Sequence, residues 1–272
     1  MVHRFLNSAH KIMSRSRAAV HLAALVSNQC RCVLSYGITN GTDIRIDGEA
    51  MLIELVAPRV HRFVDVGANV GKWTALMLAK APPDVRGLLF DAGKAAAQRL
   101  RDRFVEDPRV NIVEIGLSSA PGEASFYEVE DAGGQSSLNQ GIAISNPTKR
   151  TVKLSTLDIE CPVWDRNPID MLKIDTEGHD LHVLWGAKNL LERRAIKVIQ
   201  FEYHQLWSRA GSTLRAAADY LARFDYQLFL LKPEGLYTLD LDRFGEYFAC
   251  SNFVAVQPAM MPLLSSRIRG KF

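Results

Sequence analysis

The chain has 272 residues, which is long enough for one large α/β domain with an extension. Its hydrophobic fraction of 47% and charged fraction of 23% are ordinary for a globular protein, and a formal net charge of +3 is too small to indicate a nucleic-acid partner. Four cysteines in a chain of this length do not suggest a disulfide framework. Free thiols in a reducing cytoplasm are the simplest interpretation of these cysteines. No apolar run is long enough to span a bilayer, so we expect no transmembrane helix.

Residues 1–48 are predicted to form a helical N-terminal extension or cap. The first 42 residues contain no Asp or Glu, and they carry five basic side chains: Arg4, Lys11, Arg15, Arg17 and Arg31. Basic, partly amphipathic helices of this kind can pack against a domain, lie on an anionic membrane surface or cover a substrate site. We expect a packed cap, and a peripheral membrane contact is the more specific alternative.

Residues 63–71, Phe-Val-Asp-Val-Gly-Ala-Asn-Val-Gly, predict a buried strand, a turn of small residues and the start of a helix. This layout is typical of a nucleotide-type cofactor site, because glycine lets a ligand approach the backbone and a helix N-terminus offers unpaired N–H groups. Gly67, Asn69 and Gly71 are therefore candidate cofactor contacts. A tight turn in any doubly wound protein can have the same spacing, so the turn alone does not identify the cofactor.

Asp65 is the one acidic residue inside this predicted strand. A carboxylate in a buried strand is unfavourable unless it is paired or hydrogen-bonded. S-adenosylmethionine carries an ammonium, a sulfonium and a carboxylate, and Asp65 with the glycine turn suits that mixture. An NAD-dependent oxidoreductase is disfavoured, because the third glycine of the dinucleotide motif is missing.

The second and third strands are predicted at residues 85–90 and 110–117. Asp91 follows the second strand, where a doubly wound nucleotide site holds the ribose hydroxyls, and its two oxygens can accept from both of them. An ordinary acid in a turn is the alternative. Ser118 follows the third strand, whose end is expected to face the adenine ring.

The remaining elements complete one domain. Residues 123–130 and 151–157 predict an antiparallel hairpin, and the polar loop 131–149 between them is expected to cover the cleft. Four further strands and two helices follow. The strands are predicted at 169–174, 196–203, 226–231 and 248–256, and the helices at 179–194 and 212–224. The last strand is expected to pair antiparallel with the one before it.

Five stretches of this chain resemble the FkbM family of S-adenosylmethionine-dependent methyltransferases. They are Val-Asp-Val-Gly-Ala-Asn-Val-Gly at 64–71, Ser-Thr-Leu-Asp at 155–158, Leu-Lys-Ile-Asp-Thr-Glu-Gly at 172–178, Trp-Gly-Ala at 185–187 and Phe-Glu at 201–202. The resemblance covers roughly residues 60–256. The family usually has Glu-Pro after the second strand, whereas this chain has Asp91-Ala92, whose carboxylate has a shorter reach.

The resemblance implies an α/β, Rossmann-like class I methyltransferase fold, with a seven-stranded sheet and an antiparallel last strand. We assign the methyltransferase domain to residues 49–258 and a basic tail to residues 259–272. The resemblance also implies O-methyl transfer to a hydroxyl. We expect a carbohydrate or glycan acceptor, such as a lipo-oligosaccharide sugar. The alternatives are a polyketide-type metabolite as acceptor, or a non-catalytic module that only binds S-adenosylmethionine.

Acidic residues follow the fourth and fifth predicted strands, and Asp175, Glu202 and His204 are the candidate catalytic side chains. Two mechanisms remain open. In the first, His204 or a carboxylate takes the proton of the acceptor hydroxyl. In the second, Asp175 and Glu202 hold a divalent cation such as Mg²⁺, which lowers the pKa of that hydroxyl. We favour a mechanism with no obligatory metal.

Overall fold

A computed structural model describes residues 7, 10–39, 41, 43–128, 136–138, 148–161 and 167–272 of the chain. The chain divides into two units, Met1–Thr39 and Asn40–Phe272. This division falls a little before the boundary that the sequence predicted after residue 48. Each unit is described separately below.

The first unit contains the long helix α2 (Arg17–Ile38), so the predicted N-terminal helix is confirmed. Ser16 begins the helix, because its hydroxyl oxygen accepts a hydrogen bond from the backbone N–H of Ala19 at 3.3 Å. None of the helices in the described part of the chain is both long and apolar enough to cross a membrane. The predicted contact with a membrane surface stays a prediction.

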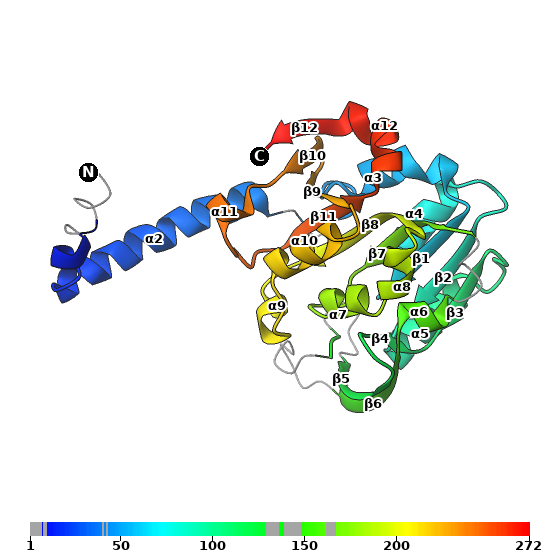
Figure 1. Cartoon of the computed structure of the whole chain (residues 1–272). Coiled ribbons are helices and arrows are strands. Elements are labelled where there is room, and N and C mark those ends of the chain that lie inside the picture. Colours follow the sequence, from blue (N-terminus) through cyan, green and yellow to red (C-terminus); the bar gives the residue numbers. More distant parts are fainter. Residues whose placement is uncertain are drawn as a thin grey trace. The chain divides into compact units, whose positions relative to one another are not determined.

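The second unit is built on one large sheet, in which nine strands are described (Figure 1). Their spatial order is β12-β10-β9-β11-β8-β7-β1-β2-β3. Their bounds are β1 (Arg62–Val66), β2 (Arg86–Phe90), β3 (Val110–Val113), β7 (Ile169–Ile174), β8 (Ile196–Tyr203), β9 (Gln227–Lys232), β10 (Gly235–Thr238), β11 (Ser251–Val256) and β12 (Ile268–Lys271).

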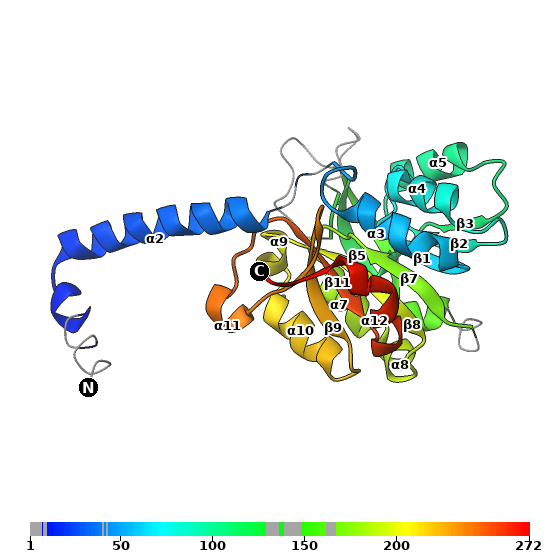
Figure 2. The same cartoon turned by 90° about the horizontal axis from the view of Figure 1, so that it is seen from above.

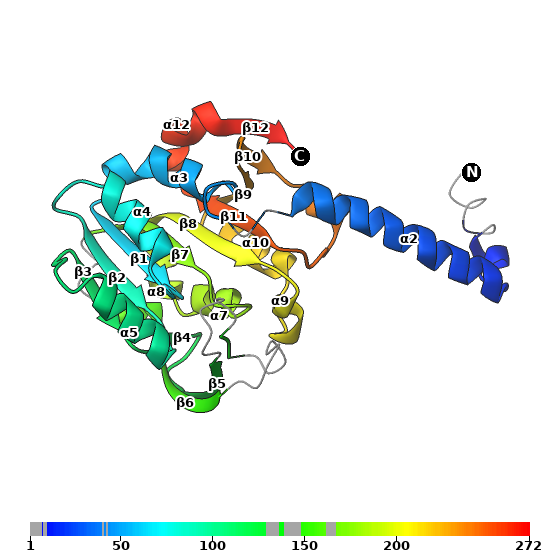
Figure 3. The same ribbon diagram turned by 180° about the vertical axis from the view of Figure 1, so that it is seen from behind.

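Strands β3, β2, β1, β7 and β8 are parallel, and β11 pairs antiparallel with both β8 and β9. These seven strands form the sheet of a class I methyltransferase, as predicted. Two strands were not predicted. Figure 3 shows one of them, β12, beside β10 at the edge of the sheet, and it belongs to the segment that was assigned to a basic tail.

Helices cover both faces of this sheet (Figure 2). On one face lie α3 (Glu49–Val56), α4 (Lys72–Lys80) and α5 (Lys94–Arg103), and on the other lie α7 (Asp180–Trp185), α8 (Lys188–Glu192) and α10 (Leu214–Ala222). The shorter helices are α6 (Leu157–Glu160), α9 (Leu206–Arg209), α11 (Leu241–Phe244), α12 (Met261–Leu264), η1 (Ala57–Arg59), η3 (Pro258–Met260) and η4 (Ser265–Arg267). Strand β7 is buried along its whole length, as expected of a parallel strand that helices cover on both sides.

The single helix predicted at 179–194 is divided into α7 and α8. A Cβ at Gly186 would lie 2.0 Å from the carbonyl oxygen of Ser118, so the chain packs too closely there for any other residue. Asp158 then starts the new helix, because its carboxylate accepts hydrogen bonds from the N–H groups of Asn189 and Leu190 at 2.9 and 3.0 Å.

A second, small sheet contains β5 (Gly122–Glu128), β6 (Thr148–Ser155) and β4 (Gly116–Leu117), in the order β4-β6-β5. The antiparallel pairing of β5 with β6 confirms the predicted hairpin. The strand predicted at 110–117 is divided, because β3 belongs to the main sheet whereas β4 pairs with β6. Of the loop predicted at 131–149, only residues 136–138, 148 and 149 are described, and the rest of that prediction lies outside the described residues.

The topology places the ends of β1 and β7 side by side. The chain runs outward from β1 through β2 to β3 and then returns to β7 on the opposite side of β1. Ligands bind at such a reversal of strand order in open α/β sheets. In the register of the two strands, Asp65 faces Lys173 and Val66 faces Ile174, so the turn after β1 meets the residues after β7.

Candidate active site

The turn after β1 is shaped by contact with the residues after β7. Gly67 has a φ of +77°, and a Cβ added to it would lie 1.8 Å from the carbonyl oxygen of Asp175. Only glycine fits that position. Asn69, with a φ of +50°, also has the left-handed conformation that non-glycine residues rarely adopt outside special sites.

Gly71 has a packing role in the fold. A Cβ at Gly71 would lie 2.6 Å from the ring of Phe104, so this glycine allows α4 to start close to α5. Gly71 does not line either of the two cavities described below. Its contact with a cofactor stays a prediction.

Asp91 lies after β2 and is held by the backbone. Its Oδ2 accepts from the N–H of Asn69 at 2.9 Å, and its Oδ1 accepts from the N–H of Gly93 at 2.8 Å. Burial raises the pKa of Asp91 to about 6. A carboxylate oxygen can accept more than one hydrogen bond, so both oxygens retain capacity for hydroxyl donors.

A first cavity opens beside Asp91 and has a volume of about 850 Å³, counted with its open mouth. Its lining includes Gly67, Asn69, Asp91, Ile115, Leu117, Phe126 and Glu177. Ser136 and Leu138, from the described part of the predicted covering loop, also line it. A lining with both polar groups and apolar side chains suits a ligand that joins a polar chain to a flat ring.

Ser118, predicted to lie near an adenine ring, is not among the residues that line this cavity. Its side chain is buried, and its hydroxyl is hydrogen-bonded to Nε2 of His179 at 2.9 Å. Ile115 and Leu117 line the cavity instead. The prediction treated residues 110–117 as one straight strand, whereas β3 and β4 belong to different sheets, and the contact of Ser118 with an adenine ring stays a prediction.

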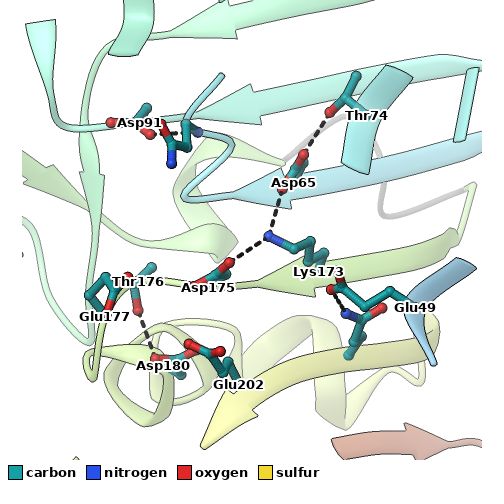
Figure 4. Close-up of polar contacts among 12 residues, drawn as sticks. Glu49, Asp65, Thr74, Asp91, Lys173, Asp175, Thr176, Glu177, Asp180 and Glu202 are labelled. Atoms are coloured by element: carbon teal, nitrogen blue, oxygen red, sulfur yellow. Dashed lines mark hydrogen bonds and ion pairs between the residues drawn. The ribbon is translucent and has the colours of Figure 1, made fainter. Parts of the chain in front are cut away.

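Asp65, Thr74, Lys173 and Asp175 form a group that we call the lysine cluster (Figure 4). Lys173 Nζ lies 3.7 Å from Asp65 Oδ1 and 3.0 Å from Asp175 Oδ2, and the Thr74 hydroxyl donates to Asp65 Oδ2 at 2.6 Å. Burial alone would lower the pKa of Lys173, but Asp175, Asp65 and Glu49 together raise it above its ordinary value. Lys173 is therefore a buried cation.

The sequence predicted a cationic group of the cofactor as the partner of Asp65. In the structure, the chain itself supplies a cationic partner, Lys173. Asp65 is fully buried and lines neither cavity, whereas Lys173 lines the second one. We infer that Asp65 positions Lys173 rather than touching the cofactor. The signal was present in the sequence, because an acid in one strand and a lysine in another can pair when the strands are neighbours.

Glu177, Glu202 and His204 form a second group, the glutamate cluster. His204 Nε2 lies 3.5 Å from Glu202 Oε2 and 3.7 Å from Glu177 Oε2. Burial, followed by the charge of Asp175, raises the pKa of Glu177 to about 9 and that of Glu202 to about 7. Burial lowers the pKa of His204. Glu177 has a φ of +52°, a second strained position at the site.

Asp180 lies in the same region as the glutamate cluster, as Figure 4 shows. It is fully buried, and the hydroxyl of Thr176 donates to its Oδ2 at 3.1 Å. Burial, with Asp175 and Glu202 nearby, raises its pKa well above the ordinary value. Acidic groups therefore outnumber basic ones at this edge of the sheet.

A second and larger cavity, of about 1950 Å³ counted with its open mouth, adjoins the first. Gly67, Asn69, Asp175 and Glu177 line both cavities. Most other lining side chains of the second cavity are polar or charged: Asp43, Arg45, Asp47, Glu49, Lys72, Arg103, Lys173, Glu202 and Asn252. Of the three predicted catalytic residues, Asp175 and Glu202 line this cavity, whereas His204 does not line it and lies 3.5 Å from Glu202.

Comparisons with known proteins were made against solved structures and against families. A methyltransferase FkbM from Methylobacillus flagellatus KT shares 15% identity over 72% of this chain, with a TM-score of 0.46, and this chain covers 43% of it. The precorrin-6y C5,15-methyltransferase from Geobacter metallireducens GS-15 shares 13% identity over 81% of this chain and 94% of its own, with a TM-score of 0.41.

The O-methyltransferase TomG from Streptomyces achromogenes, solved in complex with SAM, shares 13% identity over 77% of this chain and 79% of its own, with a TM-score of 0.39. No curated protein matches the chain. The family model described as the methyltransferase FkbM domain matches residues 65–228. Because that match covers more than half of its residues, the chain belongs to the FkbM methyltransferase family.

Proposed function

We propose that this protein transfers the methyl group of S-adenosylmethionine to a hydroxyl of a carbohydrate or glycan. The observation that carries the proposal is the junction of two cavities, which share Gly67, Asn69, Asp175 and Glu177 at the carboxyl edge of the sheet. A methyltransferase needs a donor site and an acceptor site that meet at one point, because the reacting atoms must be in line.

The first cavity has a hydrogen-bond acceptor and apolar walls that suit S-adenosylmethionine. Asp91 is fixed by two backbone N–H groups and would accept from the ribose hydroxyls. Ile115, Leu117 and Phe126 would enclose the adenine ring. When bound, the cofactor supplies a methyl group on a positively charged sulfur.

The second cavity suits a polar acceptor. Its lining carries side chains of both charges, among them Arg45, Lys72 and Asp47, which can form hydrogen bonds with several hydroxyls. A polyketide-type acceptor would be expected to meet a more apolar lining. This contrast supports a carbohydrate over that alternative.

Asp175 is the predicted catalytic side chain placed at the junction of the cavities. It lines both of them, and its Oδ2 accepts from Lys173, which holds the carboxylate in place. We propose that Asp175 takes the proton of the acceptor hydroxyl during transfer. General-base help of this kind contributes about 10²–10⁴ in rate.

The test is methyl transfer by the purified full chain to a panel of acceptors, including sugars, glycans and polyketide alcohols, followed by mass spectrometry. We expect methylated sugar and a loss of about 10²–10⁴ in kcat for Asp175→Asn, with cofactor affinity retained by calorimetry. Asp219→Asn, a change to an exposed acid on α10, serves as the control. Tight cofactor binding without transfer to any acceptor would favour the non-catalytic alternative, and methylation of the polyketide alcohols alone would favour the second acceptor class.

A further inference from the structure

The glutamate cluster has no positive group of its own among the described residues. Lys173, the buried cation nearest in the chain, is already shared by Asp65 and Asp175. Glu202 accepts at Oε1 from the Cys250 thiol at 3.0 Å, which is a neutral donor. The cluster therefore holds two carboxylates whose negative charge is only weakly neutralised.

His204 supplies an independent indication that this cluster binds a ligand. Its residue is only 7% exposed, and its Nε2 has no hydrogen-bond partner among the described residues. Buried polar atoms are normally satisfied, so an orphaned nitrogen aimed at two carboxylates calls for a reason.

The distances fit coordination better than hydrogen bonding. His204 Nε2 is 3.5 and 3.7 Å from the two carboxylate oxygens, beyond the usual range for a hydrogen bond. Two ligands that each bind a cation at about 2.1 Å lie about 3.0–3.5 Å apart. One ligand atom from each of the three residues lies within 4.8 Å of the others.

We propose that Glu177, Glu202 and His204 bind one divalent first-row cation such as Mn²⁺. Two oxygen ligands and one imidazole nitrogen suit such a cation better than Mg²⁺, which prefers oxygen ligands alone. This ligand set differs from the Asp175 and Glu202 pair that the sequence suggested for a metal. Asp175 remains with Lys173, which already neutralises it.

Coordination through Nε2 requires the ring proton of His204 to be on Nδ1. In the structure Nδ1 accepts from the N–H of Leu206 at 3.4 Å, a long and weak hydrogen bond. Coordination would give up this contact. Little is lost, because the contact lies at the limit of hydrogen-bond geometry.

The position of the cation indicates its use. Glu177 and Glu202 line the second cavity, so the cation would face the acceptor and leave open positions for a hydroxyl oxygen. It would lower the pKa of that hydroxyl and orient its oxygen, while Asp175 takes the proton. This catalytic role rests on the proposed function, whereas cation binding does not.

The experiment is a titration of the chelator-treated full chain with Mn²⁺, without cofactor. Electron paramagnetic resonance measures the concentration of free Mn²⁺ at each step. We expect one bound Mn²⁺ per chain and an affinity that falls more than about tenfold in Glu202→Gln and in His204→Ala. Asp219→Asn is expected to keep the affinity of the wild type. Parallel titrations with Mg²⁺ and Zn²⁺ establish the preference, and circular dichroism shows that each variant is folded.

Three outcomes would overturn the proposal. They are absence of binding to the wild type, unchanged affinity in both ligand variants, and release of Mn²⁺ by S-adenosylmethionine, which would mean that the cluster receives the cofactor ammonium instead. Cofactor affinity is measured by calorimetry on the same samples. If the cofactor does not bind but Mn²⁺ does, the proposed function fails and the cation site stands.

Discussion

The lysine cluster and the glutamate cluster lie at the ends of neighbouring strands, and both are rich in acids, but they differ in charge balance. In the lysine cluster, Asp65 and Asp175 share a buried ammonium, and Thr74 adds a hydroxyl donor. In the glutamate cluster, Glu177 and Glu202 face a histidine whose pKa is lowered by burial, and Glu202 also accepts from the neutral Cys250 thiol. The first cluster is complete as part of the fold, and the second is suited to receive a cation from outside.

Removing the cation of the lysine cluster is expected to have the largest effect on stability. Lys173→Met leaves Asp65 buried beside an apolar chain, and breaking a buried pair in this way costs about 3–5 kcal/mol of the free energy of unfolding. Urea unfolding, followed by circular dichroism, measures it. Lys188→Met is the matched control, because Lys188 forms an exposed pair with Glu192 that contributes at most about 0.5 kcal/mol.

The double variant Asp65→Asn with Lys173→Met is expected to recover part of that loss, because the fully buried Asp65 then carries no charge, and Asp175, which also loses its partner, is in contact with solvent. A Lys173→Met variant as stable as the Lys188→Met control would show that Asp65 and Lys173 are not a mutually dependent pair.

The contact between the turn after β1 and the residues after β7 can be tested at Gly67. Gly67→Ala would place a Cβ 1.8 Å from the carbonyl oxygen of Asp175, so the turn after β1 must move. Gly211→Ala is a close control, because Gly211 has a φ of +68° but nothing within 4 Å of the added carbon. We expect Gly67→Ala to lower the free energy of unfolding by about 1–3 kcal/mol more than the control. Equal losses would mean that backbone conformation alone explains the glycine.

Asp91 extends the comparison to an acid whose partners are two backbone N–H groups. Its carboxylate form is the one that can accept from two ribose hydroxyls, and its pKa is raised to about 6 by burial. Cofactor affinity should therefore fall about tenfold as pH falls from 7 to 5. Asp91→Asn should bind weakly at pH 7 and show no such change, which calorimetry across this pH range measures.

The same raised pKa has the opposite effect on the fold without cofactor. A carboxyl group whose pKa is higher in the folded state contributes stability that is complete below its ordinary pKa and is lost as pH rises through about 6. The stability of the wild type relative to Asp91→Asn should therefore rise as pH falls, while cofactor affinity falls. If relative stability and cofactor affinity changed in the same direction with pH, the assignment of Asp91 to the ribose would be contradicted.

The smallest effect on the free energy of unfolding is expected in the glutamate cluster. There, removal of a charge should stabilise the fold, whereas removal of the Lys173 charge destabilises it. In chelator-treated protein, Glu202→Gln removes one of several crowded acids and should raise the free energy of unfolding by about 1 kcal/mol. With Mn²⁺ present, the wild type should gain stability and the variant should not, because only the wild type binds the cation tightly. Thermal unfolding with and without Mn²⁺ measures both, and destabilisation of the chelator-treated variant would argue for a cluster that is already balanced.

The sequence predicted this architecture well where local patterns determine it. The strand before Gly67, the acid after β2, the acids after β7 and the acid at the end of β8 could all be read from apolar runs that end in polar residues. Their convergence followed from parallel strands, whose carboxyl ends share one edge. The family resemblance supplied the topology that periodicity alone leaves open.

The sequence was least informative where a residue's contacts depend on a distant part of the chain. The pairing of Asp65 with Lys173 depends on β1 lying beside β7, and the packing of Gly71 depends on Phe104 from α5. Similarly, β12 was read as a basic tail because its strand character comes from pairing with β10. Local sequence carries little information about such partners.

The shared lining of the two cavities has a consequence for inhibition. Gly67, Asn69, Asp175 and Glu177 belong to both cavities, so a ligand in one cavity changes the surface that is presented to the other. The two affinities are then linked, and the linkage is reciprocal. A single compound joining a nucleoside to a sugar through a short linker would bind both cavities with one loss of translational freedom, and could exceed the affinity of either half.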